Sequence, residues 1–182
     1  MNIPAGGWAL FDTAIGWCGI AWGDAGLRGA QLPQADEAAT RARMQRRFPR
    51  LPECEPPPEW RALVADLQAL LRGEPRDLSG TRLDWRGVTE FHQRVYRAAL
   101  AIPPGCTLTY GDIAQQIGEP GGARAVGQAL GANPFAPVVP CHRVLAAGGH
   151  HGGFSAHGGA ATKLKMLQIE GARPPDDQPT LF

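Results

Sequence analysis

The sequence of 182 residues lacks the patterns that mark membrane, secreted and zinc-ribbon proteins. Its longest apolar runs are broken by glycine, proline or charge well short of a membrane span, and its N-terminus lacks the basic flank and apolar stretch of a signal peptide. The four cysteines lie far apart without a CxxC pair, and the histidines follow no ligand spacing. We therefore expect a cytoplasmic protein with free thiols, no membrane association and no bound metal.

The balance of charge identifies no partner. The net charge is +1 at neutral pH, and binding to nucleic acid requires a local basic surface rather than a basic total. The run RARMQRRFPR, residues 41–50, is basic, but such a pattern is more typical of a solvated helix face. The length and the 43% of hydrophobic residues suit one good core or two small ones.

The first third of the chain has the pattern of a small antiparallel sheet followed by helices. Residues 8–13, 15–23 and 27–32 alternate as strands do, with glycine and aspartate between them. Helices are expected over 35–48, which starts acidic and ends basic, and over 57–73, which has proline at its entry and glycine at its exit. The second helix places its large apolar residues on one face that should pack on the sheet: Trp60, Leu63, Val64, Leu67, Leu70 and Leu71.

A domain boundary is expected where this periodicity stops. The segment 73–87 is rich in turn-forming residues, and we place the boundary near Asp84, which gives domains of residues 1–84 and 85–182. Beyond it, the pattern predicts a helix over 88–101 with Thr89 as its N-cap, and a last helix that ends at Gly171 before a loose tail.

The middle of the second half has a helix-turn-helix pattern. It predicts a helix over 110–117, a Gly/Pro turn, and a second helix over 123–130, the one that usually meets DNA. This second helix is slim, with Arg124 as its only charge, so it offers little for reading base edges in a major groove. A slim helix suits a close approach to something narrow, and a single arginine suits insertion.

The stretch NPFAPVVPCHRV, residues 133–144, places a cysteine and a histidine side by side after several prolines. Prolines favour extended backbone, so Cys141 and His142 should point to opposite faces and communicate through a bridging water. A thiol needs a base or a positive field to become a nucleophile, and His142 and Arg143 supply these. Residue types alone favour the alternative, in which Cys141 is a buried, inert side chain and the two residues after it lie at the surface.

Several motifs around this cysteine occur in a recognisable order. PVVPCHRV follows TYGDIAQQIG and ARAVGQALGANP and precedes GGFSAHGG and IEG. Together they resemble the O6-alkylguanine-DNA alkyltransferases, also called methylated-DNA:protein-cysteine methyltransferases, from Val88 to Gly171. The resemblance implies an α+β protein in which an N-terminal ribonuclease-H-like α/β domain precedes a helical winged-helix (helix-turn-helix) domain that binds DNA and carries the active-site cysteine.

The resemblance also implies a reaction and its catalytic residues. An alkyl group moves from O6 of guanine in double-stranded DNA to Cys141, once per molecule and without a cofactor, with O4 of thymine as a further candidate donor. His142 is the water-mediated base of Cys141, and Glu170 orients His142. Asn133 braces the turn before the cysteine, and Tyr110 donates a proton towards N3 of the departing guanine.

The implied partner is double-stranded DNA that contains O6-alkylguanine. The protein would bind it as a monomer, with clustering on DNA as an option, in the cytoplasm at the nucleoid. Arg124 would replace the flipped nucleotide, and Ser155 would contact guanine O6, while the carbonyl oxygens of Cys141 and Val144 would receive the amino group of the base. The remaining contacts along the minor groove would come from Ala123, Ala125 and Gly127.

Other functions are conceivable for the same residues. A noncatalytic binder of alkylated DNA, like the alkyltransferase-like proteins, carries another residue at the cysteine position, so Cys141 argues against it. A cysteine hydrolase would use Cys141 and His142 as a dyad, but neighbouring residues on a stiff extended strand are badly placed for direct proton transfer.

Overall fold

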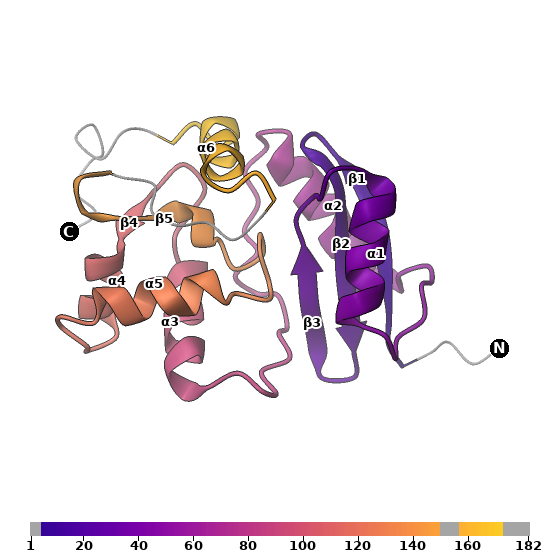
Figure 1. The fold of residues 1–182 in the computed structure, drawn as a ribbon, viewed down its shortest axis with the longest axis horizontal. Helices are drawn as coiled ribbons and strands as arrows, with labels where there is room; N and C mark the ends of the chain where they lie inside the picture. The colour runs from indigo at the N-terminus through magenta and orange to yellow at the C-terminus, as the bar shows by residue number, and fades with distance from the viewer. Residues whose placement is uncertain (1–4, 150–156, 173–182) are drawn as a thin grey trace. The chain divides into compact units, whose positions relative to one another are not determined.

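The computed structural model describes residues 5–149 and 157–172 (Figure 1). The chain forms two compact units. Unit 1 contains Met1–Arg86 and a short later segment, Pro134–Val138, whereas unit 2 contains Gly87–Asn133 and Val139–Phe182. The mixed α/β content agrees with the fold class expected from the sequence.

The predicted antiparallel sheet is confirmed in unit 1. Strands β1 (Gly7–Thr13), β2 (Gly16–Gly23) and β3 (Gly26–Gln31) are antiparallel neighbours in that order. Residues at alternate positions of β1 face opposite sides of the sheet, so each side offers its own set of apolar residues. Each side is covered by a helix, with α1 in front of the strands in Figure 1 and α2 behind them.

Backbone hydrogen bonds tie the chain up to Asp84 to the edge of this sheet. The Leu27 amide donates to the Arg82 carbonyl, and the Asp84 amide donates to the Leu27 carbonyl, both at 2.8 Å. Gly26 allows this close approach, because its φ of +134° favours glycine and a Cβ there would lie 2.5 Å from the Arg82 oxygen. These bonds satisfy part of the open edge of β3.

Helix α1 (Glu37–Arg47) begins at a capped end and closes the core on one side of the sheet. The Asp36 side chain accepts a hydrogen bond from the Ala39 amide at 2.8 Å, which satisfies a free amide of the first turn. The acidic start and basic end predicted from the sequence are both present. The helix contributes to a buried cluster of Trp8, Ala21, Met44 and Phe48.

Helix α2 (Pro58–Leu71) covers the other side of the sheet. Its predicted apolar stripe is buried apart from Val64, which is half-buried. The later segment Pro134–Val138 also belongs to unit 1, where the Pro134 carbonyl accepts hydrogen bonds from the Ala30 amide at 2.9 Å and from Arg47 at 3.1 Å.

Unit 2 contains the predicted helix-turn-helix. Helix α3 (Glu90–Leu100) starts at Thr89, whose hydroxyl accepts a hydrogen bond from the His92 amide as an N-cap. Helices α4 (Tyr110–Gln116) and α5 (Ala123–Gly131) follow within one residue of the predicted bounds. Terminal residues of helices vary by this much with the definition used.

The remaining elements of unit 2 surround the cysteine. A 3₁₀ turn η1 (Cys141–Arg143) leads into strand β5 (Val144–Leu145), which pairs in parallel with strand β4 (Leu108–Thr109). A second short turn η2 (Ala147–Gly149) and helix α6 (Ala160–Ile169) complete the unit. Over the described residues, no helix has both the length and the apolar composition that a membrane span requires.

Met44 should contribute strongly to the stability of the protein, because its side chain is fully buried in the core of unit 1. We expect Met44→Ala to lower the free energy of unfolding by about 2–5 kcal/mol through lost burial and a residual cavity. Arg43→Ala, its exposed neighbour on α1, should change it by less than about 0.5 kcal/mol. Urea unfolding followed by tryptophan fluorescence measures both, and equal effects would contradict the assigned packing.

Candidate active site

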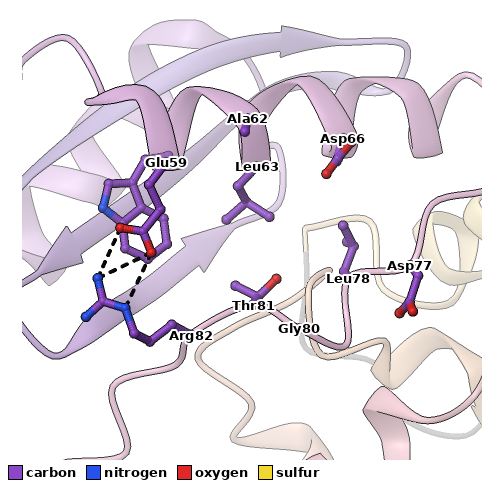
Figure 2. Close-up of a pocket in the computed structure, with 10 residues that line it drawn as sticks. Glu59, Ala62, Leu63, Asp66, Asp77, Leu78, Gly80, Thr81 and Arg82 are labelled. Atoms are coloured by element: carbon purple, nitrogen blue, oxygen red, sulfur yellow. Dashed lines mark hydrogen bonds and ion pairs between the residues drawn. The ribbon is translucent and has the colours of Figure 1, made fainter.

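The residues singled out in the sequence lie in unit 2, except Ser155, which falls outside the described residues. Unit 1 has a pocket of its own between α2 and the loop that follows it (Figure 2). There Glu59 and Arg82 face each other, with oxygen and nitrogen 3.1 Å apart. The pocket contains none of the predicted site residues, so the candidate site is built around Cys141.

The predicted extended backbone at Cys141 is wrong. The chain leaves Pro140 into a 3₁₀ turn, in which the Arg143 amide donates to the Pro140 carbonyl at 2.9 Å. The physical reason is that a proline restricts itself and the residue before it, and the residue directly after Cys141 is a histidine. Successive side chains of a 3₁₀ turn are about one third of a turn apart, so Cys141 and His142 do not lie on opposite faces of a strand.

The turn carries two further side chains into the interior instead of the surface. His142 is fully buried and Arg143 is 5% exposed, which contradicts the alternative that places both at the surface. Both bond to the Glu170 carboxylate: His142 Nε2 lies 2.7 Å from Oε1, and Arg143 donates to Oε1 at 2.8 Å and Oε2 at 3.0 Å. Arg143 also donates to the Ile102 carbonyl at 2.7 Å.

These bonds determine the charge of each group. Burial acts to raise the pKa of Glu170, but the hydrogen bonds from His142 and Arg143 outweigh it and lower that pKa to about 2. Burial lowers the pKa of His142 below its ordinary value, against the opposing effect of Glu170. At neutral pH the site therefore holds a carboxylate, a guanidinium and a neutral imidazole.

The bond to Glu170 also selects the tautomer of His142. A carboxylate only accepts hydrogen bonds, so His142 Nε2 carries the proton and Nδ1 has the free lone pair. Over residues 5–149 and 157–172, Nδ1 is the buried side-chain nitrogen or oxygen without a hydrogen-bond partner. His142 is therefore a neutral base with an available nitrogen, next in the chain to the cysteine.

Cys141 is 7% exposed, and its surroundings have opposing effects on the pKa of its thiol. Burial raises the pKa of the thiol, whereas a hydrogen bond from the Asn133 side chain and the positive charge of Lys163 act to lower it. Asn133 Nδ2 also donates to the Val139 carbonyl at 2.9 Å, which holds the turn that precedes the cysteine. The resting thiol is protonated and needs a base to react.

Tyr110 lies at the start of α4, where a capping box holds the helix end. The Asp112 amide donates to the Thr109 hydroxyl at 3.0 Å, and the Thr109 amide donates to the Asp112 carboxylate at 2.8 Å. Burial and then the charge of Cys141 raise the pKa of the half-buried Tyr110 phenol, which keeps its proton. A Cβ at Gly127 would lie 4.0 Å from the ring, so a small residue brings the α5 backbone close to it.

The outer face of α5 is the slim surface that the sequence predicts. Arg124 and Ala125 are exposed, and Ala123 and Gly127 are half-buried. The buried residues of the helix, Val126, Ala129 and Leu130, face the core. Arg124 is thus a lone cation on an exposed face of small residues.

Sequence reasoning missed Lys163 on α6. Its side chain is 1% exposed, and its Nζ donates to the Val144 carbonyl at 2.7 Å. Lys163, Met166, Leu167 and Glu170 follow the spacing of one helix face. That spacing, with two buried apolar residues between two charged ones, was the signal that could have revealed it.

The described residues contain no group of three or more His, Cys, Asp or Glu side chains arranged to hold a metal ion. His157 lies within the described residues, whereas His150 and His151 lie outside them.

Comparison with known proteins agrees with this site. Residues 90–172 match the family model for the DNA-binding domain of 6-O-methylguanine DNA methyltransferase. A methylated-DNA–protein-cysteine methyltransferase of Mycobacterium tuberculosis is 48% identical over 126 residues, which cover 69% of this chain and 73% of the relative. Its counterpart from Methanothermobacter thermautotrophicus is 33% identical over 153 residues, 84% of this chain and 78% of the relative.

The fold is shared as well. The crystal structure of Mycobacterium tuberculosis OGT in complex with DNA superimposes with a TM-score of 0.71 at 38% identity, covering 93% of this chain and 96% of that one. The matched family model and the shared fold place the chain in the class of DNA alkyltransferases. The chain belongs to the methylated-DNA–protein-cysteine methyltransferase family.

The hydrogen bonds to Glu170 should make the stability of the fold depend on pH in the acid range. A carboxyl whose pKa falls from 4.5 to about 2 on folding stabilises the fold above pH 4.5 and loses this contribution, about 3 kcal/mol, as pH falls towards 2. Glu170→Gln should lower the free energy of unfolding at pH 7 by about 3–5 kcal/mol, because Arg143 keeps its buried charge without a partner.

A matched variant separates this effect from general acid sensitivity. Glu119 forms an exposed ion pair with Arg94, and Glu119→Gln should cost less than about 1 kcal/mol. Urea unfolding at several pH values is the measurement. A Glu170→Gln protein with the stability and acid profile of the unmodified protein would contradict the assigned charges.

Proposed function

We propose that this protein repairs alkylated DNA by moving an alkyl group from O6 of guanine in double-stranded DNA to the sulfur of Cys141. The observation that carries the proposal is that His142, the residue after Cys141, is buried and hydrogen-bonded to Glu170. It lies within the residues that match the DNA-binding domain of the family. A neutral histidine with a free nitrogen provides the base that a protonated, buried thiol requires.

The reaction is a displacement at a saturated carbon. The thiol proton passes to His142 Nδ1, by the predicted bridging water, and Glu170 stabilises the imidazolium that forms. The sulfur attacks the alkyl carbon, the bond between that carbon and O6 breaks with its electrons on the base, and Tyr110 donates its phenolic proton towards N3. The thioether has no hydrolysable acyl bond, so each molecule reacts once.

DNA recognition would come from the helix-turn-helix. A guanine paired inside a duplex hides O6 from a buried thiol, so the nucleotide must flip out of the stack. The exposed small residues of α5 fit the narrow minor groove, and Arg124 would fill the space left by the flipped base. Ser155 is proposed to contact O6, and the carbonyl oxygens of Cys141 and Val144 to receive the amino group of guanine.

We further infer the finer organisation of the molecule. The antiparallel order of β1, β2 and β3, with helices on the sheet, supports a ribonuclease-H-like domain over residues 1–84, followed by a winged-helix domain over 85–182. The protein would act as a monomer, with clustering on DNA as an option, in the cytoplasm at the nucleoid. It would need no cofactor, and O4-alkylthymine would be a further substrate.

Cys141 should be the alkyl acceptor. A duplex with isotopically labelled O6-methylguanine should transfer one label per protein to the peptide that contains Cys141, detected by mass spectrometry without further turnover. Cys141→Ser should lose transfer and retain duplex binding, because the thiolate is removed while the helix-turn-helix stays intact. Cys106→Ser, the control within the same unit, should react like the unmodified protein. Label on another residue, or turnover, would refute the assignment.

Arg124 should matter for flipping and not for the chemistry at sulfur. We expect Arg124→Ala to slow transfer from duplex DNA by about tenfold or more, since the flipped state loses the side chain that fills the stack. Reaction with the free base O6-methylguanine should stay unchanged. Gln128→Ala, an exposed position on the same helix, serves as the control. An Arg124→Ala protein with the full rate on duplex DNA would show that the insertion role is incorrect.

A further inference from the structure

We propose that Lys163 is a positioning residue for alkyl transfer: its buried ammonium is the counter-charge of the Cys141 thiolate and holds the Val144 carbonyl in place. This role rests on the transfer reaction proposed above, in which Lys163 has had no part so far. Lys163 makes and breaks no covalent bond in that reaction. It acts through the cysteine and through the backbone of β5.

The position of the ammonium supports the role. Lys163 extends from α6, and its Nζ donates to the Val144 carbonyl at 2.7 Å. The same nitrogen lies 5.7 Å from the centre of the Tyr110 ring, a cation–π distance. One buried cation therefore touches the strand after the cysteine and the aromatic residue at the start of α4.

The ammonium of Lys163 and the thiolate form of Cys141 stabilise each other. Burial lowers the pKa of Lys163 to about 8, and the charge of Cys141 acts in the opposite direction. The positive charge of Lys163 in turn acts to lower the pKa of the Cys141 thiol, against burial. A buried ammonium and a buried thiolate are each costly alone, whereas together they neutralise each other in a medium that screens charge weakly.

The other titratable groups near the ammonium define its task. Its charge acts on Cys141 and His142 of η1, and its Nζ lies over the ring of Tyr110 at the start of α4. Its charge acts to lower the pKa of His142, so Lys163 favours the thiolate and disfavours an imidazolium. The Glu170 carboxylate, bonded to His142 and Arg143, counters that effect on the histidine. Each half of the proton transfer thus has its own counter-charge.

The bond to Val144 gives Lys163 a second, geometric task. A carbonyl oxygen has two lone pairs, and Lys163 occupies one of them. The other remains for the amino group of the flipped guanine, as proposed above. Because Val144 follows the cysteine turn directly, fixing its carbonyl also fixes the end of that turn.

The test compares Lys163→Met with Lys165→Met, an exposed position on the same helix. The pKa of Cys141 is measured from the pH dependence of its alkylation by iodoacetamide, followed on its own peptide by mass spectrometry. Lys163→Met should raise this pKa by about one unit or more, since an opposite charge nearby shifts a pKa by that amount. Single-turnover transfer from an O6-methylguanine duplex near neutral pH should slow about tenfold, with the duplex Kd unchanged within about twofold.

The conservative variant Lys163→Arg separates charge from packing. It keeps a cation, so the thiol pKa should stay closer to that of the unmodified protein than in Lys163→Met, even where the larger side chain lowers Tm. If Lys163→Met transfers at the unmodified rate with an unchanged thiol pKa, the role of Lys163 is refuted while the proposed function stands. Failure of the unmodified protein to transfer would refute the proposed function itself.

A measurement on the unmodified protein covers the case of an unfolded variant. Lys163 and Lys165 are the lysines of the chain, so ¹³C-lysine labelling gives NMR signals that Lys165→Arg assigns. If Lys163 and Cys141 are coupled, the Lys163 signals of the unmodified protein should show two titration steps, its own and that of the thiol. Methylation of Cys141 removes the ionisable thiol and should leave one step, while the titration of Lys165 stays the same. An unchanged Lys163 titration after methylation would overturn the proposal.

Discussion

The active site depends on one buried carboxylate. Glu170 accepts hydrogen bonds from His142 and Arg143 at 2.7–3.0 Å in a place where its side chain is 4% exposed. Without these donors, burial of the carboxylate would cost too much free energy. Without the carboxylate, burial of the Arg143 guanidinium would cost too much as well. Arg143 carries the compensating charge, which leaves His142 neutral and available as a base.

Charge compensation also explains the other groups around the cysteine. A cysteine that attacks a small alkyl group has to be shielded from water, yet shielding raises the pKa of its thiol. Unit 2 supplies a neutral histidine on the turn η1 and a buried cation, Lys163, on helix α6. Reactivity is thereby restricted to a substrate that reaches the buried sulfur, which suits the single reaction per molecule that we propose.

Sequence patterns predicted the elements with strong periodicity and clear ends. The α2 stripe, the Thr89 cap and the two helices around the Gly/Pro turn were all readable, because each rests on local spacing. The two-residue strands β4 and β5 were not, because two residues carry no period. The turn at Cys141 was missed because proline constraints were extended past their range.

Side-chain roles were harder to read than elements. A histidine beside a cysteine can be predicted to act as its base, but the burial of Arg143 and Lys163 contradicts the usual behaviour of such residues. Their partners, Glu170 and the Val144 carbonyl, become neighbours only after folding. The roles assigned to Glu170, Asn133 and Tyr110 depended on family resemblance and stay predictions.

The parallel pairing of β4 with β5 has a consequence for how such a site evolves. Its register places Thr109 opposite Leu145 and Leu108 opposite Val144. Backbone geometry therefore sets the distance between the segment that leads into Tyr110 and the segment that begins after the cysteine turn. Side chains around this frame can change without altering its width. In the reaction that we propose, single substitutions could therefore change the size of the alkyl group that is accepted, while this backbone frame between Tyr110 and Cys141 stays constant.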